Sequence, residues 1–127
     1  MEKDDNTAHT PKGEHVAVFI KNVAVIFKKV TSEGLTTVKE PKKKPPGPNG
    51  EKIIKYYKIK TTAEYKKDEK GDIKIRLALP WKLRAEERKL WQWDKTNNKW
   101  YNITKYYNSE YNFIVGKTKH ISIFGVT

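Results

Sequence analysis

The chain has 127 residues, a formal charge of +12 and no cysteine, and 36% of its residues are hydrophobic. That length suits one domain with its own core, and the absence of cysteine excludes disulfides, thiolate metal ligands and thiol catalysis. No apolar run approaches the roughly 20 residues that a membrane-spanning helix needs, and residues 1–14 lack the apolar centre of a secretory signal. We expect residues 1–14 to be a flexible leader and residues 15–127 to form the domain.

The predicted elements alternate apolar and polar residues with a period of two, which is typical of β-strands. Between Ile73 and Leu79 every second residue is isoleucine or leucine, so these side chains share one face. In chain order, strands are expected over residues 15–22, 23–30, 35–40, 52–67, 73–79, 90–94, 99–104, 112–118 and 121–127. Turn signals separate them at residues 31–34, 67–72, 95–98 and 106–111, and residues 81–90 have room for one or two helical turns. The pattern predicts an all-β, antiparallel β-sandwich of about eight or nine short strands in a single domain.

Residues 41–51, PKKKPPGPNGE, interrupt the strands. Four prolines and two glycines do not fit the interior of a sheet. We therefore expect an exposed, stiff, cationic loop with partial polyproline II character. Its lysines, Lys42, Lys43 and Lys44, are candidate contacts for an anionic ligand.

The positive charge invites a polyanionic partner, either nucleic acid or an acidic polysaccharide. Only three of the basic residues are arginines, the side chain that reads bases and phosphates bidentately. The lysines are spread over almost every segment, and a lysine-rich, cysteine-free composition is typical of a thermophile protein or of an AT-rich genome. We expect a dispersed, solvated charge with weak, salt-sensitive polyanion binding, and specific nucleic-acid binding is disfavoured.

Residues 90–104, LWQWDKTNNKWYNIT, hold three of the four tryptophans. Trp91 and Trp93 share one face of a strand, and Trp100 lies on the return strand of a hairpin. They pack either in a sandwich core, where buried tryptophan is common, or on an exposed platform for a sugar. The core interpretation is favoured, with the three tryptophans kept as candidate binding residues.

Residues 106–111, YYNSEY, form a second aromatic cluster in a predicted turn. Tyr106, Tyr107 and Tyr111 either stack on sugars or bases or cover the end of the sandwich, and the covering role is favoured.

The residues that carry catalysis or bind metals are scattered. The three histidines do not have metal-ligand spacing, no serine has a nucleophile-elbow context, and no pair of carboxylates suggests an acid and a base. The sequence predicts no enzyme, no catalytic residues, no metal and no cofactor.

Six blocks of the chain, in order, are FKKVTSEGLTTV (residues 27–38), PPGPNG, YYKIKTTAEY (residues 56–65), LALPW (residues 77–81), LWQWDKTNNKWYNIT and VGKTKHISIFGV (residues 115–126). Together and in this order they resemble a β-sandwich module that recurs in secreted and cell-surface proteins of bacteria and archaea. Relatives often carry cysteines where this chain has Ala78 and Val115, which implies that these two strands are neighbours. Members of the module are usually acidic. The lysines found here in place of neutral or acidic residues disfavour calcium binding.

The resemblance implies an extracellular or cell-surface location and a non-catalytic structural or interaction role. The partners implied are neighbouring domains or components of an envelope or matrix. The alternative is a binding module for an anionic polymer, polysaccharide or nucleic acid, that uses lysines and loop aromatics.

Overall fold

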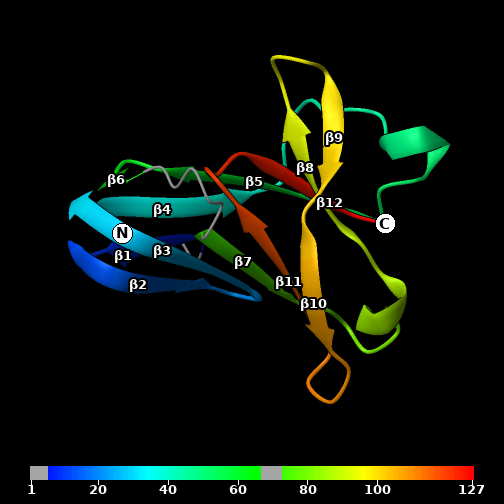
Figure 1. The fold of residues 1–127 in the computed structure, drawn as a ribbon, viewed down its shortest axis with the longest axis horizontal. Coiled ribbons are helices and arrows are strands. Elements are labelled where there is room, and N and C mark those ends of the chain that lie inside the picture. The colour runs from blue at the N-terminus through cyan, green and yellow to red at the C-terminus, as the bar shows by residue number, and fades with distance from the viewer. Residues whose placement is uncertain (1–5, 67–72) are drawn as a thin grey trace.

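The structure, a computed structural model, describes residues 6–66 and 73–127, and its strands form two antiparallel sheets stacked face to face (Figure 1). Sheet A contains, in spatial order, β1 (Thr7–Thr10), β4 (Gly34–Lys39), β5 (Lys55–Thr61), β12 (Ile123–Val126), β8 (Leu90–Asp94) and β9 (Lys99–Asn102). Sheet B contains β10 (Thr104–Asn108), β11 (Phe113–Thr118), β7 (Ile73–Ala78), β3 (Val23–Ser32) and β2 (Gly13–Ile20), with β6 (Glu64–Tyr65) paired to the end of β3. The all-β antiparallel class is confirmed.

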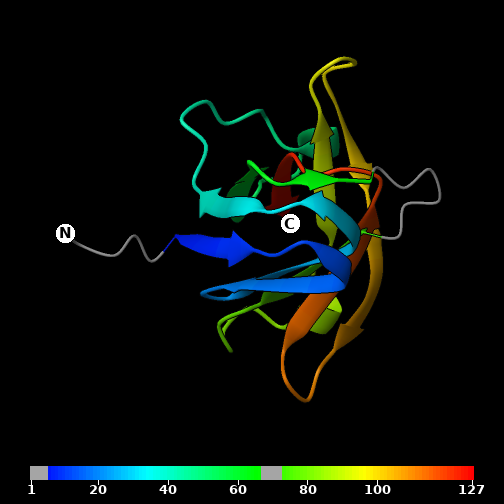
Figure 2. The ribbon, with the colours of Figure 1, turned by 90° about the vertical axis from the view of Figure 1, so that its left-hand side faces the viewer.

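The number of strands was expected to be eight or nine, which is too low, because 12 strands occur in the described residues. Three strands were not expected separately: β1, which lies in the expected leader, β6, which splits from the end of the expected 52–67 strand, and β10, which continues from β9 where the chain crosses from one sheet to the other. At Ile103, between β9 and β10, the amide donates to the Leu90 carbonyl of sheet A at 2.9 Å. The Ile103 carbonyl accepts from the Lys117 amide of sheet B at 3.1 Å. Consequently the β8–β9 and β10–β11 hairpins point in opposite directions (Figure 2).

The expected flexible leader is corrected from Thr7 onward, because Thr7–Thr10 form β1 and pair with β4. The Thr10 side chain is fully buried, and its hydroxyl contacts that of Thr36 at 2.5 Å. This strand carries no apolar alternation, so its pairing depends on backbone bonds and on threonine's preference for extended structure.

The main core lies between the sheets and follows the predicted alternation. Ile73, Ile75 and Leu77 are completely buried, while Lys74 and Arg76 lie on the other face. Fully buried partners come from both sheets: Val25, Phe27, Ile59, Leu90, Ile114, Phe124 and Val126. Val25 and Phe27 point inward, so Ile26 between them lies on the outer face of sheet B.

The β7 and β11 strands are neighbours, as the resemblance implied for Ala78 and Val115. The partner of Ala78 is Phe113, however, and Val115 lies opposite Arg76. Val115 is buried but is not part of the main core.

Two expected turns have different outcomes. The turn expected over residues 67–72 lies outside the described residues. The turn expected over residues 106–111 is shifted, because Tyr106 and Tyr107 continue β10. The chain reverses after Asn108, and Asn112 has the positive φ of 56° that asparagine tolerates.

Residues 81–90 hold a single 3₁₀ turn, Ala85–Glu87, and a second 3₁₀ turn spans Pro48–Gly50. The described part of the chain contains no helix of the length and apolar character that would cross a bilayer.

Candidate anion-binding groove

A second apolar cluster lies on the outer face of sheet A, away from the main core. It is built from Ile53, Trp91 and Trp100, with Tyr56 and Trp93 packed against it. On β8, Leu90 enters the main core while Trp91 joins the outer cluster, so the alternation predicted for this strand is confirmed. The tryptophans therefore do not lie in the sandwich core, and that expectation is wrong. They do not form a coplanar platform either, but the half-buried Trp93 stays a candidate binding residue.

The tryptophans are arranged across the hairpin between β8 and β9. Trp93 pairs with Trp100 in register, and their ring centroids are 5.1 Å apart at an interplanar angle of 58°. Trp100 is 7% exposed, whereas Trp93 is only half-buried. Trp100 is therefore a packing residue, and Trp93 keeps a free surface.

The proline-rich segment, residues 41–48, covers this cluster. The Trp100 indole donates a hydrogen bond from Nε1 to the Pro46 carbonyl at 2.5 Å, and the Tyr56 hydroxyl donates to the Pro45 carbonyl at 2.6 Å. Tyrosine and tryptophan side chains that hold proline carbonyls are the means by which polyproline ligands are bound. Here the ligand is the chain's own loop, which is consequently held against the sheet.

Gly125 on β12 makes room for this packing. A side chain there would place its Cβ 2.9 Å from the Ile53 Cδ1 and 3.3 Å from Trp100. The neighbours of Gly125 across the sheet are Tyr56 and Trp91. The absence of a side chain at Gly125 thus lets Ile53 pack directly on the sheet.

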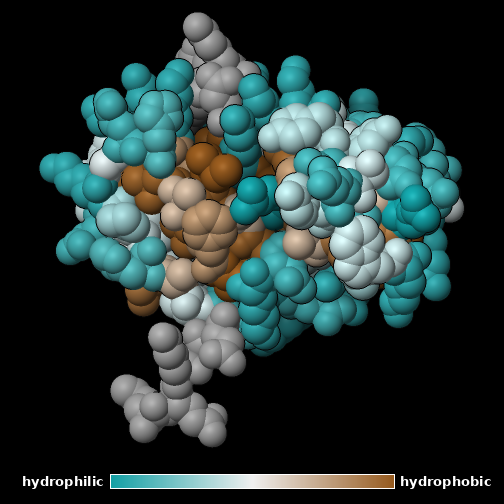
Figure 3. Space-filling view, turned by 90° about the horizontal axis from the view of Figure 1, so that it is seen from below, coloured by the Kyte–Doolittle hydropathy of each residue, from teal (hydrophilic) through white to brown (hydrophobic). Residues whose placement is uncertain are grey.

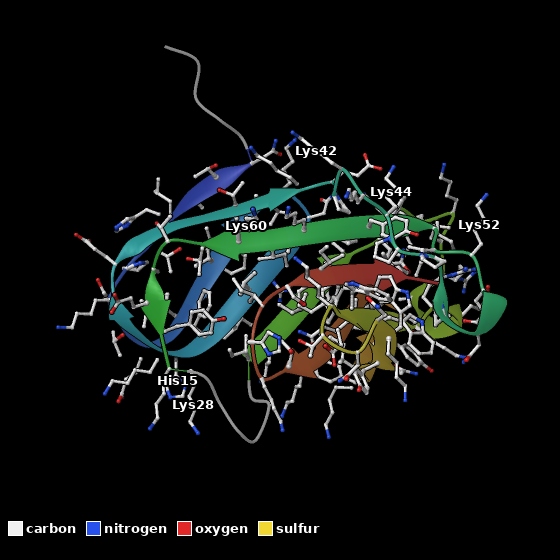
Figure 4. The ribbon with its side chains drawn as sticks, turned by 90° about the horizontal axis from the view of Figure 1, so that it is seen from above. His15, Lys28, Lys42, Lys44, Lys52 and Lys60 are labelled. Carbon is white, nitrogen blue, oxygen red and sulfur yellow. The ribbon has the colours of Figure 1, made fainter. Side chains whose placement is uncertain are left out.

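The lysines of the loop are exposed, whereas Pro41 and Pro48 at its two ends are buried. Between the loop and the tip of the β8–β9 hairpin lies a groove of about 1100 Å³, which we name the lysine groove. Trp93 and Ile123 form part of its wall. Six lysines line it: Lys42, Lys43, Lys44, Lys58, Lys60 and Lys95. Figure 4 shows Lys42, Lys44 and Lys60 on this side of the molecule.

The charge of the lysine groove is almost uncompensated. Among the residues that the structure describes, Asp94 is the only carboxylate that lines the groove, and Lys44 pairs with Glu40 beside it. Within the part of the chain that the structure describes, Lys42, Lys43, Lys58, Lys60 and Lys95 form no ion pair. The pKa of Lys58 is lowered by its contact with Lys60 and the charge of that ammonium, and further by Lys42 and Lys95. Like charges this close destabilise the fold, which an anionic ligand would relieve.

A second hollow of about 640 Å³ extends the lysine groove along sheet A. It shares Lys42, Lys58 and Lys60 with the groove and continues to Thr37 and Thr61. The basic surface therefore has the elongated form that a linear polymer requires.

The polar side chains near the tryptophans mostly hold the protein together. Asp94 accepts bonds from the Thr96 amide at 2.9 Å and from the Asn97 side chain at 2.8 Å. These bonds, led by that to the Asn97 side chain, lower the pKa of Asp94. The buried Gln92 amide donates to the carbonyl of His120 and to the hydroxyl of Ser122, at 2.9 and 3.0 Å. Gln92 thereby holds residues 120–122, which line the groove, in place.

The structure brings together Lys42, Lys43, Lys44 and Trp93, four of the candidate binding residues. Trp91 and Trp100 belong to the apolar cluster on the outer face of sheet A but do not line the groove. Tyr106, Tyr107 and Tyr111 are exposed, and they lie on or beside β10 in sheet B, so they do not contribute to the groove.

Sequence reasoning missed Lys58, Lys60, Lys95 and His120. A signal for the first two was present, because Lys58 and Lys60 alternate with the buried Ile59 and must share an outer face. Nothing in the sequence placed that face opposite Lys42.

The described residues contain no group of three or more histidine, aspartate or glutamate side chains placed to hold a metal. Comparison with protein-family models, with curated proteins and with solved structures found no match for this chain. The resemblance to a surface-protein module is therefore still a prediction.

Proposed function

We propose that this chain is a non-catalytic β-sandwich module that binds an anionic polysaccharide in the lysine groove. Of the two functions expected from the sequence, a structural module and a polyanion-binding module, the second has the stronger support. The observation that carries it is the convergence of six lysines on one groove that holds a half-buried tryptophan.

A polysaccharide suits the groove better than a nucleic acid. Trp93 offers an apolar ring face on which a sugar can stack, and Asn98, Thr96 and Ser122 line the same groove with groups that bond hydroxyls. All three arginines lie elsewhere, on β7 and around the Ala85–Glu87 turn. The groove therefore lacks the side chain that reads bases and phosphates bidentately.

The test is calorimetric titration with polygalacturonate, which carries a carboxylate on each sugar, beside neutral dextran and an oligothymidylate. We expect binding of polygalacturonate that weakens steeply with added salt, weaker binding of the oligonucleotide, and no binding of dextran. Tighter binding of the oligonucleotide would move the assignment to nucleic acid, and failure of both polyanions would refute it.

The lysines are tested by a matched pair of double variants with the same change in net charge. Lys58→Gln with Lys60→Gln removes charge from the groove, while Lys29→Gln with Lys105→Gln removes it from exposed positions of sheet B. We expect the first pair to weaken binding roughly ten- to hundredfold and the second to change it little. Because Lys58 and Lys60 repel each other, the groove variant should keep or slightly raise its melting temperature. Equal effects of the two double variants would show that the polysaccharide responds to net charge and not to the lysine groove.

A further inference from the structure

The outer face of sheet B carries an apolar surface with an arginine at its centre. A row of paired residues crosses this face from Phe19 through Ala24, Arg76 and Val115 to Tyr106. Phe19 is 62% exposed, which is unusual for a phenylalanine on a flat sheet. Figure 3 shows apolar residues gathered on this side of the molecule.

Arg76 is held in place by the rings on either side of it. Its guanidinium carbon lies 5.7 Å from the centroid of Phe19 and 5.4 Å from that of Phe113. No ion pair involves Arg76 in the described residues. A guanidinium oriented by two aromatic rings, with its hydrogen-bond donors unused by a carboxylate, is prepared for bidentate contact with one.

The surroundings of Arg76 determine which partner fits. The adjacent row runs from Ala17 through Ile26 and Lys74 to Lys117. Neither row, nor the pair formed by Ala78 and Phe113, contains a carboxylate. The face is therefore apolar and basic. A second copy stacked on it would bring arginine and lysines against each other, which is unfavourable.

We propose that this face, whose accessible side chains are Phe19, Arg76, Phe113 and Tyr106, with Ala24 and Val115 buried in the same row, docks an acidic amphipathic helix of another polypeptide. The apolar stripe of such a helix covers the sheet, as helices cover sheets in layered domains. One carboxylate within the stripe pairs with Arg76. This surface lies on the opposite sheet from the lysine groove, so it is independent of the polysaccharide proposal.

The probe is a short stapled helix of alanine and leucine with one central glutamate on its apolar side, titrated into ¹⁵N-labelled protein. We expect saturable shifts of the amides of Ala24 and Val115 and of the Arg76 Nε–H. A matched peptide with glutamine in place of glutamate should bind roughly ten- to hundredfold more weakly. Equal binding of the two peptides, or no shift with either, would overturn the proposal.

Two variants complete the test. Arg76→Gln should make the two peptides bind alike, whereas Lys60→Gln on sheet A should leave their difference unchanged. Phe19→Ser alters an exposed side chain, keeps the fold and should weaken both peptides. If Phe19→Ser instead abolishes flotation with phosphatidylserine vesicles, the face binds membranes and the proposal fails. It also fails if Phe19→Ser abolishes a concentration-dependent dimer.

Discussion

Trp100 and Pro46 are 54 residues apart in the sequence and are joined by a hydrogen bond from the indole Nε1 to the proline carbonyl. With the parallel bond from Tyr56 to Pro45, this contact turns a proline-rich loop into a fixed wall. The lysines of that loop, Lys42 to Lys44, therefore reach the groove from a defined backbone.

Replacing Trp100 by alanine should lower the free energy of unfolding by about 3–5 kcal/mol, the usual cost of removing a buried tryptophan. That is a large share of the stability of an ordinary domain. The measurement is urea denaturation followed by circular dichroism. Trp100→Phe is the comparison variant, because it keeps an aromatic ring and loses the hydrogen bond to Pro46, worth about 1 kcal/mol, together with part of the indole packing, so its loss should be smaller than that of Trp100→Ala. An unchanged unfolding midpoint for Trp100→Ala would refute its packing role.

Replacing Trp93 by alanine should separate affinity from stability. Trp93 is half-buried and lines the lysine groove, so we expect a smaller loss of stability than for Trp100→Ala. The affinity for polygalacturonate should fall roughly tenfold, the ratio that about 1.4 kcal/mol of lost stacking produces. Trp81, which is 67% exposed outside the groove, supplies the matched variant, and Trp81→Ala should change neither quantity. Unaltered binding by Trp93→Ala would show that the Trp93 ring does not contact the polysaccharide.

Replacing Tyr57 by phenylalanine should leave stability at neutral pH unchanged or raised. The Tyr57 hydroxyl is buried and has no hydrogen-bond partner in the described residues, so its desolvation is not compensated. Removing it should recover up to about 1–3 kcal/mol in chemical denaturation. A clear loss of stability would show that the hydroxyl is bonded.

Tyr57 also predicts how stability depends on pH. Burial raises its pKa from 10.0 to about 12, so above pH 10 the unfolded chain loses this proton before the folded chain does. Stability should therefore fall as the pH rises from about 10 to 12, by up to about 1.4 kcal/mol for each pH unit. Tyr57→Phe lacks this contribution, and the difference between the two proteins isolates it from other alkaline titrations. Identical pH profiles would contradict the assignment.

Asn112 should be the most sensitive position of the β10–β11 reversal. Its amide nitrogen donates to the carbonyls of Leu79, Pro80 and Leu83, and its Oδ1 accepts from the Ala85 amide at 2.8 Å. Asn112→Ala loses these bonds and places alanine at a positive φ, so we expect a loss of about 2–4 kcal/mol in thermal or urea unfolding.

Asn108 provides the control for Asn112. The Oδ1 of Asn108 accepts one exposed hydrogen bond, from the Tyr111 amide. Asn108→Ala should cost about 1 kcal/mol or less. Similar losses for the two variants would show that Asn112 does not organise residues 79–85.

The sequence by itself determined which side chains share a face. From Ile73 to Leu77 the period of two predicts the buried positions correctly, and in β8 it separates Leu90 from Trp91. Such predictions succeed because successive side chains of a strand point to opposite faces whatever the tertiary structure. The all-β class follows from the same local rule.

Only the tertiary structure decided what covers each face. The sequence placed Trp100 on the hairpin and the prolines in a loop after β4. No local rule brings that loop onto an indole of β9, which is 54 residues away and separated from β4 by three strands of the sheet. The same holds for Lys42 and Lys60. Their like charges line one groove because the loop is packed on the outer cluster. The crossing of one extended segment at Ile103 from sheet A to sheet B, followed by a register shift between Thr104 and Tyr106, is likewise not predicted by a period of two. Long-range packing, not local propensity, sets these relationships, because their energy comes from apolar contacts between segments distant in the chain.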